Sequence, residues 1–295
     1  MGVCCSRRNG KSVEDAKFRY IDGRRYHNIS ESEYIGANDE EEANRLIQYH
    51  EVIKIVWEGL YHSPIENKLE NGANVIDIGC GAGIWLLEMA QKYPNSHFVG
   101  IDFSPIFPTE GLPKNLKFIN CNFLDGVPFE DSYFDFAHQK FMAAAFTKVQ
   151  WKEKVIPELL RITKSGGWIE FTEAELIRSN GTNMQRIVKG MKKFFEEKDL
   201  VCVMKGSLSH LLEDTNAFSE IRNEQKTITL GKKGDYIGQE TLKFYMRAIT
   251  SGRIILSSFM DVMPEHFDAL AETAFIETEN SDTFGDQLRI CCHKL

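Results

Sequence analysis

The residues Val75-Ile76-Asp77-Ile78-Gly79-Cys80-Gly81-Ala82-Gly83 are the most informative part of this 295-residue sequence. It begins as a short apolar strand, passes through three glycines and enters a helical pattern over residues 84–93, just before Pro94. Glycines let the backbone adopt positive φ angles and let a ligand approach the main chain closely. A strand, a glycine loop and a helix in this order are typical of the first βαβ unit of a nucleotide-binding α/β fold.

Strand and helix patterns alternate on both sides of this loop. The expected strands are residues 74–78, 97–101, 116–121, 133–138, 167–172, 221–230 and 287–293. Alternation of this kind predicts parallel βαβ units with right-handed crossovers, whose ligands bind at the carboxyl ends of the strands. The sequence therefore predicts an α/β protein with a Rossmann-like, seven-stranded, mostly parallel sheet and helices on both faces.

Composition excludes several classes of protein. The 35 Lys+Arg against 43 Asp+Glu give a net charge of −8, whereas nucleic-acid binding needs a basic surface, so we expect no nucleic-acid partner. No apolar run approaches ~18 residues, so we expect no transmembrane helix. Seven cysteines without Cys-x-x-Cys spacing favour neither a disulfide framework nor a zinc site, and we expect no metal. Reduced thiols favour a cytoplasmic location, with a nuclear one left open.

The glycine spacing and two acids separate two classes of ligand. A dinucleotide fingerprint reads Gly-x-Gly-x-x-Gly, but Ile84 holds the place of its third glycine. Asp77 precedes the loop, where a carboxylate would repel a pyrophosphate. Asp102 ends the second strand, where an acid binds a ribose diol through charge-assisted hydrogen bonds. Asp77 and Asp102 together favour an adenosine ligand with a cationic tail, such as S-adenosylmethionine. An NAD-dependent oxidoreductase is far less compatible with this sequence, because the third dinucleotide glycine is absent.

Four motifs in register carry a resemblance to a known family. They are VIDIGCGAG, VGIDFSP, INCNFLDGVPFEDSYFD and RITKSGGWIEF, and together they cover about residues 73–173. Their order and spacing resemble class I S-adenosylmethionine-dependent methyltransferases. Residues 34–61 further resemble the helical lead-in of fungal velvet-complex-type methyltransferases that regulate secondary metabolism. The usual Lys-Pro-Gly-Gly turn of the family appears here as Lys164-Ser165-Gly166-Gly167, without its proline.

The resemblance implies a domain organisation. Residues 1–37 are expected to be a flexible N-terminal segment, and 38–295 the methyltransferase domain. Asn38 is placed to cap the lead-in helix, with Glu41 closing a capping box. Inside the domain we expect a cofactor-binding core over 73–173 and helical lid and substrate-binding insertions over 175–220 and 235–280.

The resemblance also implies which residues hold S-adenosylmethionine. Gly79, Cys80, Gly81 and Gly83 would line its methionine and ribose portion, with Asp77 near its amino group.

The second and third strands would supply the rest of the cofactor site. Asp102 would bind the ribose hydroxyls, and Phe103 would pack against the adenine. Asn122 stands where many relatives have Asp and would accept from the adenine amino group. Phe123 would flank the ring.

The fourth strand ends at the expected reacting centre. Methyl transfer from a sulfonium is an in-line displacement, so the protein mainly supplies orientation and electrostatics. Gln139 is expected to contact the cofactor. His138 is the candidate catalytic base for a hydroxyl or amine acceptor, because imidazole titrates near physiological pH. The alternative is that His138 only bonds the strand end or the cofactor.

The amino terminus carries a separate motif. Met1-Gly2-Val3-Cys4-Cys5-Ser6 matches the myristoylation pattern at Gly2, and Cys4 and Cys5 are candidate palmitoylation sites. Basic residues follow, and these favour an anionic membrane surface. Two acyl signals would anchor the protein peripherally, whereas the alternative is an unmodified terminus.

Two functions stay open on the sequence. The first is a methyltransferase that acts on a small molecule, the favoured acceptor, or on a protein side chain. The second is a regulatory module that binds the cofactor and works through a protein partner. Both require the same cofactor site, and only the first requires turnover.

Overall fold

The computed structural model describes residues 18–21, 23–27, 37–201 and 206–295. Its centre is a sheet of eight strands in the order β5-β4-β3-β6-β7-β10-β8, with β9 paired to β10. The parallel strands are β3 (Asn74–Ile78), β4 (His97–Asp102), β5 (Leu116–Asn120), β6 (Phe134–Lys140) and β7 (Thr163–Ala174). The antiparallel strands are β8 (Arg178–Ser179), β9 (Phe218–Thr229) and β10 (Thr283–Lys294). The mostly parallel α/β class is confirmed.

The sheet holds one strand more than the seven expected. Phe284 of β10 lies opposite both Arg178 of β8 and Thr229 of β9, so β8 and β9 flank β10 on opposite sides. Both β7 and β8 pair with the same edge of β10, at different positions along it, so the two-residue β8 lies in line with β7. The sheet is therefore seven strands wide, and the extra strand is a short segment that sequence patterns do not resolve.

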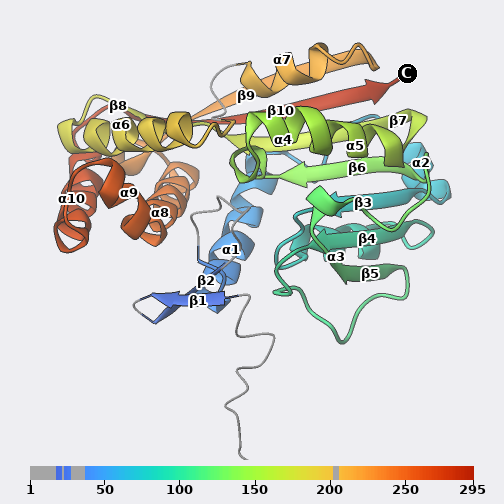
Figure 1. Ribbon diagram of the computed structural model, residues 1–295, viewed down its shortest axis with the longest axis horizontal. Coiled ribbons are helices and arrows are strands. Elements are labelled where there is room, and N and C mark those ends of the chain that lie inside the picture. The colour runs from blue at the N-terminus through green and yellow to red at the C-terminus, as the bar shows by residue number, and fades with distance from the viewer. Residues whose placement is uncertain (1–17, 22, 28–36, 202–205) are drawn as a thin grey trace, which may run out of the picture.

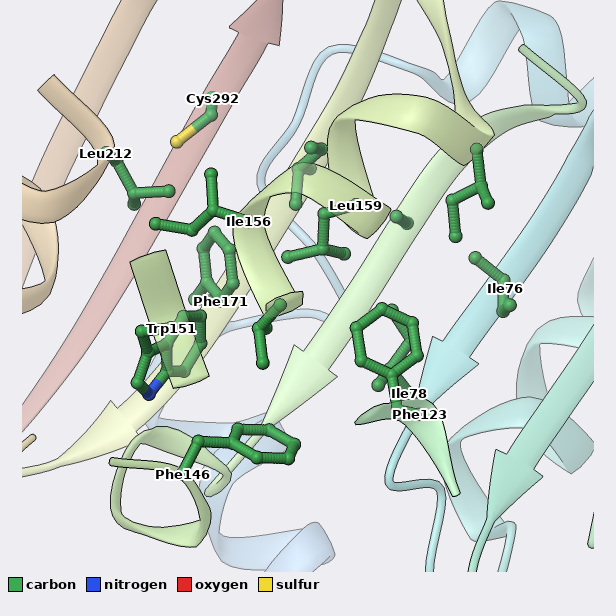
Figure 2. Packing of buried hydrophobic residues seen from close by; sticks show 14 of the residues in the cluster. Ile76, Ile78, Phe123, Phe146, Trp151, Ile156, Leu159, Phe171, Leu212 and Cys292 are labelled. Atoms are coloured by element: carbon green, nitrogen blue, oxygen red, sulfur yellow. The ribbon is translucent and has the colours of Figure 1, made fainter. Parts of the chain in front are cut away.

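Helices cover both faces of the sheet (Figure 1). They are α1 (Glu40–Trp57), α2 (Glu66–Asn71), α3 (Ile84–Lys92), α4 (Lys148–Gln150), α5 (Ile156–Ile162), α6 (Thr182–Glu197), α7 (Ser207–Glu213), α8 (Tyr236–Ser251), α9 (Arg253–Phe259) and α10 (Pro264–Glu277). On one face, Ile156 and Leu159 of α5 lie over the strands that carry Ile76 and Phe171 (Figure 2). On the other face, Trp85 of α3 packs into the cluster around β3 and β4.

The two insertions form a packed helical layer beside the sheet. Figure 1 shows α6, α8, α9 and α10 gathered at one end of the strands. Met184 and Phe194 of α6 are buried with Leu242 of α8 and Phe267 of α10 in a core of their own. Burial of this apolar surface holds the helices together.

The N-terminal region differs from expectation in two places. Phe18–Ile21 and Arg24–His27 pair as the antiparallel strands β1 and β2, where we expected an irregular segment. Tyr26 of β2 donates to the Ser251 carbonyl at the end of α8 over 3.0 Å, which docks the hairpin on the domain. The cap of α1 is Asp39, whose carboxylate accepts from the Glu42 N–H, and not Asn38.

Among the described residues, no helix combines the length and apolar character that a membrane span needs.

Candidate active site

A cavity of about 340 Å³ opens at the carboxyl ends of the parallel strands. The chain runs from β3 outward through β4 to β5, and returns to place β6 beside β3, so the strand order reverses between β3 and β6. Ligands of open α/β sheets bind at such a point. Gly79 and Gly81 follow β3 into the cavity wall, Asp102 ends β4, Lys140 ends β6, and Glu173 lies near the end of β7.

The glycine loop is shaped by close packing. Gly79, Gly81 and Gly83 have φ angles of 70°, 54° and 74°, which only glycine adopts without strain. A Cβ on Gly79 would lie 2.8 Å from Met142 Cε, and a Cβ on Gly83 would lie 2.7 Å from Phe118 Cε1. Gly79 and Gly81 line the cavity, whereas Gly83 is needed for packing against β5 and does not line it.

Asp102 links the glycine loop to the loop after β4. Its Oδ2 accepts from the Gly81 N–H over 2.8 Å, and its Oδ1 accepts from the Ser104 N–H over 2.7 Å. Burial raises the pKa of this carboxyl to about 6, although the two backbone donors oppose the rise. Each carboxylate oxygen keeps a further lone pair, so the group can accept from a ligand at the same time.

The aromatic wall expected beside the adenine lines the same cavity. Phe103, Asn122 and Phe123 all lie there, next to Asp102. The Asn122 Oδ1 accepts from the Leu124 N–H over 3.1 Å and caps the short turn that follows. The structure therefore brings together six of the residues expected to bind cofactor: Gly79, Gly81, Asp102, Phe103, Asn122 and Phe123.

Asp77 and His138 lie behind this cavity and pair with each other. The His138 Nδ1 is 2.7 Å from the Asp77 Oδ1, and both side chains are buried. The His138 ring stacks on Trp85 with centroids 3.9 Å apart. Neither residue lines the cavity, so the expected contact of Asp77 with a ligand amino group and the expected base role of His138 are not supported by their positions. The register explains this, because Asp77 and His138 are direct neighbours on adjacent strands.

Cys80 and Gln139 also lie outside the cavity lining. Burial raises the pKa of the Cys80 thiol well above its usual value, so the thiol stays protonated at neutral pH. The Gln139 side chain is buried, and within the described part of the chain both ends of its amide lack a hydrogen-bond partner. Residues Gly2, Cys4 and Cys5, the expected lipidation sites, lie outside the described residues.

Two ionisable residues in the cavity wall were missed by the sequence analysis. Burial lowers the pKa of Lys140 to about 8, and its Nζ lies 3.1 Å from the His50 Nδ1. Burial raises the pKa of Glu173 to about 8, and its Oε1 accepts from the N–H groups of Met142 and Ala143. Each is a charged residue at the end of a buried strand, and the same pattern that identified Asp102 could have identified both.

The helices close the cavity on the side away from the glycine loop. Met191 and Phe195 of α6 and Phe244 and Tyr245 of α8 line this side. Met184 and Phe194, also on α6, are buried in the helical core and do not line the cavity. An apolar cover of this kind excludes water from a bound ligand.

The side chains of His50, Glu51 and Glu88 come close enough together to hold a cation. The Lys54 Nζ already lies 3.0 Å from the Glu51 Oε1 and 2.9 Å from the Glu88 Oε1. The ammonium group supplies the positive charge that a metal ion would bring, so we assign this cluster to an ion-pair network.

Comparison with known proteins agrees with this architecture. Residues 75–167 match the family model described as "Methyltransferase domain". N-methyltransferase verN of Clonostachys rogersoniana is 30% identical over 172 residues, which cover 57% of this chain and 54% of the relative. Secondary metabolism regulator LAE1 of Cochliobolus heterostrophus is 28% identical over 171 residues, which cover 57% and 55%. Methyltransferase pytC of Aspergillus terreus is 32% identical over 164 residues, which cover 54% and 47%.

The chain spans about half the length of these curated relatives. A solved structure described as a "putative sarcosine dimethylglycine methyltransferase" from Galdieria sulphuraria is 15% identical. The alignment covers 87% of this chain and 90% of that protein, with a TM-score of 0.48. The resemblance to fungal methyltransferases that the motifs indicated is confirmed. Residues 75–167, which hold the glycine loop and the strands around it, match a methyltransferase domain.

Proposed function

We propose that this protein transfers the methyl group of S-adenosylmethionine to an acceptor bound in the same cavity, with a small molecule as the favoured acceptor. The observation that carries the proposal is the cavity at the strand-order reversal, where Gly79, Gly81 and Asp102 share one wall. The match to a methyltransferase domain over these residues supports the same reading.

The residues present fit this methyl donor. Gly79 and Gly81 keep the backbone open to close approach, and Asp102 keeps lone pairs for the two ribose hydroxyls. Phe103 and Phe123 offer aromatic surface for the adenine.

Asp77 supports the loop from behind in this proposal. Its pairing with His138 fixes the end of β3, from which the glycine loop starts. Both are positioning residues, and the proposal assigns neither a proton-transfer step. This role replaces the base function that the sequence suggested for His138.

The protein's part in the reaction is orientation in a water-poor space. The donor supplies the electrophilic methyl group, so the chain needs no nucleophile of its own. The apolar cover from α6 and α8 would exclude water and hold acceptor and donor in line.

Calorimetric titration tests the proposal at the binding step. We expect S-adenosylhomocysteine to bind and NAD to show no binding, because the loop lacks the third dinucleotide glycine. Tight NAD binding without S-adenosylhomocysteine binding would overturn the assignment. Release of S-adenosylhomocysteine from labelled donor in the presence of metabolite and protein pools then tests turnover.

A regulatory module is the second candidate. It is supported by the similarity to a relative named secondary metabolism regulator. This candidate predicts cofactor binding without turnover in either pool, together with capture of a protein partner that depends on bound cofactor. Release of S-adenosylhomocysteine in the presence of the metabolite pool would support the methyltransferase over the regulatory module.

We further propose that the chain is anchored to a membrane surface from the cytoplasmic side through its first residues. The support is the sequence Met1-Gly2-Val3-Cys4-Cys5-Ser6 and the basic residues after it. Labelling cells with an alkyne analogue of myristate should mark the wild type and not Gly2→Ala. An unlabelled wild type would contradict the anchor while leaving the cofactor site untouched.

A further inference from the structure

Glu173 presents a carboxylate to the cavity with one oxygen uncommitted. The hydrogen bonds it accepts, from the N–H groups of Met142 at 2.9 Å and Ala143 at 3.0 Å, both end on Oε1. None of the ion pairs between described residues includes Glu173. Burial raises its pKa, and the only groups that lower it are the same two backbone N–H donors. Oε2 is therefore available to a molecule in the cavity.

The position of Glu173 is next to the glycine loop. The Met142 segment that it holds packs on Gly79, since a Cβ there would lie 2.8 Å from Met142 Cε. Glu173 and Gly79 line the same cavity, at the ends of β7 and β3. Asp102 and Phe103 mark the nucleoside end at β4, which places Glu173 toward the methionine end, where the methyl group would be transferred.

The charges around the cavity favour a cationic occupant. Its ionisable lining comprises the acids Glu42, Asp102, Glu173 and Glu175, the bases Arg45 and Lys140, and the neutral groups Cys121 and Tyr245. Glu42 is bonded to Arg45, with the Arg45 Nε 2.8 Å from the Glu42 Oε2. Even with Glu173 uncharged before binding, the acids Glu42, Asp102 and Glu175 outnumber the two bases, so the cavity disfavours an acceptor with a carboxylate or phosphate group.

A buried carboxylate is stable as an anion only when a partner supplies charge and hydrogen bonds. An ammonium group supplies both, with two or three N–H donors and a positive charge. A hydroxyl supplies one donor and no charge, and a carbon acceptor supplies neither. Among nucleophile classes, the amine therefore fits Glu173 best.

We propose that the methyl acceptor is an amine and that Glu173 binds its N–H group and takes its proton. This inference rests on the proposed function and narrows its acceptor class. The ammonium form of the acceptor gives one proton to Glu173 Oε2, and the nitrogen lone pair that is freed attacks the methyl carbon of the sulfonium. The C–S bond breaks with its electron pair on sulfur, which leaves neutral S-adenosylhomocysteine and a methylated ammonium. The proton on Glu173 passes to solvent when the product leaves.

Binding of matched probes to the protein saturated with S-adenosylhomocysteine tests this inference. The probes are benzylamine and benzyl alcohol, phenethylamine and 2-phenylethanol, and tryptamine and tryptophol, which differ within each pair only in the reacting group. Calorimetry at pH 7 in buffers of different ionisation enthalpy reports both affinity and protons released. We expect the amine of at least one pair to bind tenfold or more tightly than its alcohol, with release of about one proton because Glu173 is largely protonated before binding.

Two variants test whether Glu173 is the group that releases the proton when the amine binds. Glu173→Gln keeps the size of the side chain and both backbone hydrogen bonds, and should abolish proton release and the preference for amines. Glu272→Gln, an exposed position on α10, is the matched control and should behave as wild type. S-adenosylhomocysteine affinity should change less than twofold in both.

The outcomes separate this inference from the function on which it rests. Failure of the wild type to bind S-adenosylhomocysteine overturns the proposed function. Cofactor binding with no amine preferred over its alcohol overturns the amine assignment alone. A preference for amines that persists in Glu173→Gln overturns the role of Glu173.

Discussion

Replacing Asp102 tests the proposed cofactor site through a quantity that the geometry sets. Each of its oxygens already accepts one backbone N–H, from Gly81 and from Ser104, and each keeps capacity for one ribose hydroxyl. A hydrogen bond to a charged group contributes about 1.5 kcal/mol or more, so loss of two costs about 3 kcal/mol. At 1.36 kcal/mol per tenfold, Asp102→Ala should weaken S-adenosylhomocysteine binding by about 150-fold. Asp102→Asn keeps one acceptor oxygen and should lose about tenfold.

The assay is isothermal calorimetry with S-adenosylhomocysteine on wild type, both variants and Asp125→Asn. Asp125 is an exposed carboxylate on the turn after Asn122 and does not line the cavity, so its variant should match wild type. The affinity of wild type should also fall as the pH drops below about 6, because protonation of Asp102 removes acceptors that the ribose hydroxyls need. Equal affinities for Asp102→Ala and wild type, with both folded, would show that Asp102 does not bind the ribose.

The remaining predictions concern packing and stability. Asp77→Asn should lower the free energy of unfolding by about 3 kcal/mol in urea titrations, because it weakens a buried pairing with His138, and the S-adenosylhomocysteine affinity of the folded variant should fall less than in Asp102→Ala. Gly79→Ala should weaken S-adenosylhomocysteine binding at least tenfold by calorimetry, whereas Gly111→Ala, with a similar φ but open space around it, should cost only about 1 kcal/mol of stability. The folded-state pKa of Glu173 is raised, so its stabilising contribution is full below pH 4.5 and is lost as the pH rises to about 8. Glu173→Gln should therefore flatten the decline in unfolding free energy between pH 5 and pH 8, and an unchanged slope would contradict the buried, unpaired state of this carboxylate.

The sheet was predictable because its signals are local. The run 75–83 contains a buried strand, the glycines and the start of a helix within a few residues, and the structure has all three. Asp102 was identifiable for the same reason, since a charged residue at the end of a buried strand needs a partner or a ligand. β8 was missed because two residues carry no periodicity.

The parts of the site that the sequence did not reveal depend on contacts between distant segments. Nothing local to Asp77 or His138 indicates that they are register neighbours on adjacent strands, so their pairing was not expected. Gly83 carries the same local signal as Gly79, and only their different neighbours, Phe118 for Gly83 and Met142 for Gly79, distinguish them. Docking of Tyr26 on the end of α8 joins residues 225 positions apart, which no sequence window spans.

A crystal structure of the complex with S-adenosylhomocysteine would show whether the cofactor occupies the cavity at the ends of the strands. We expect the ribose hydroxyls within hydrogen-bond distance of the Asp102 carboxylate, the adenine beside Phe103 and Phe123, and the sulfur between Gly79 and Glu173. Density for the ligand anywhere other than this cavity, or a ribose turned away from Asp102, would contradict the assignment.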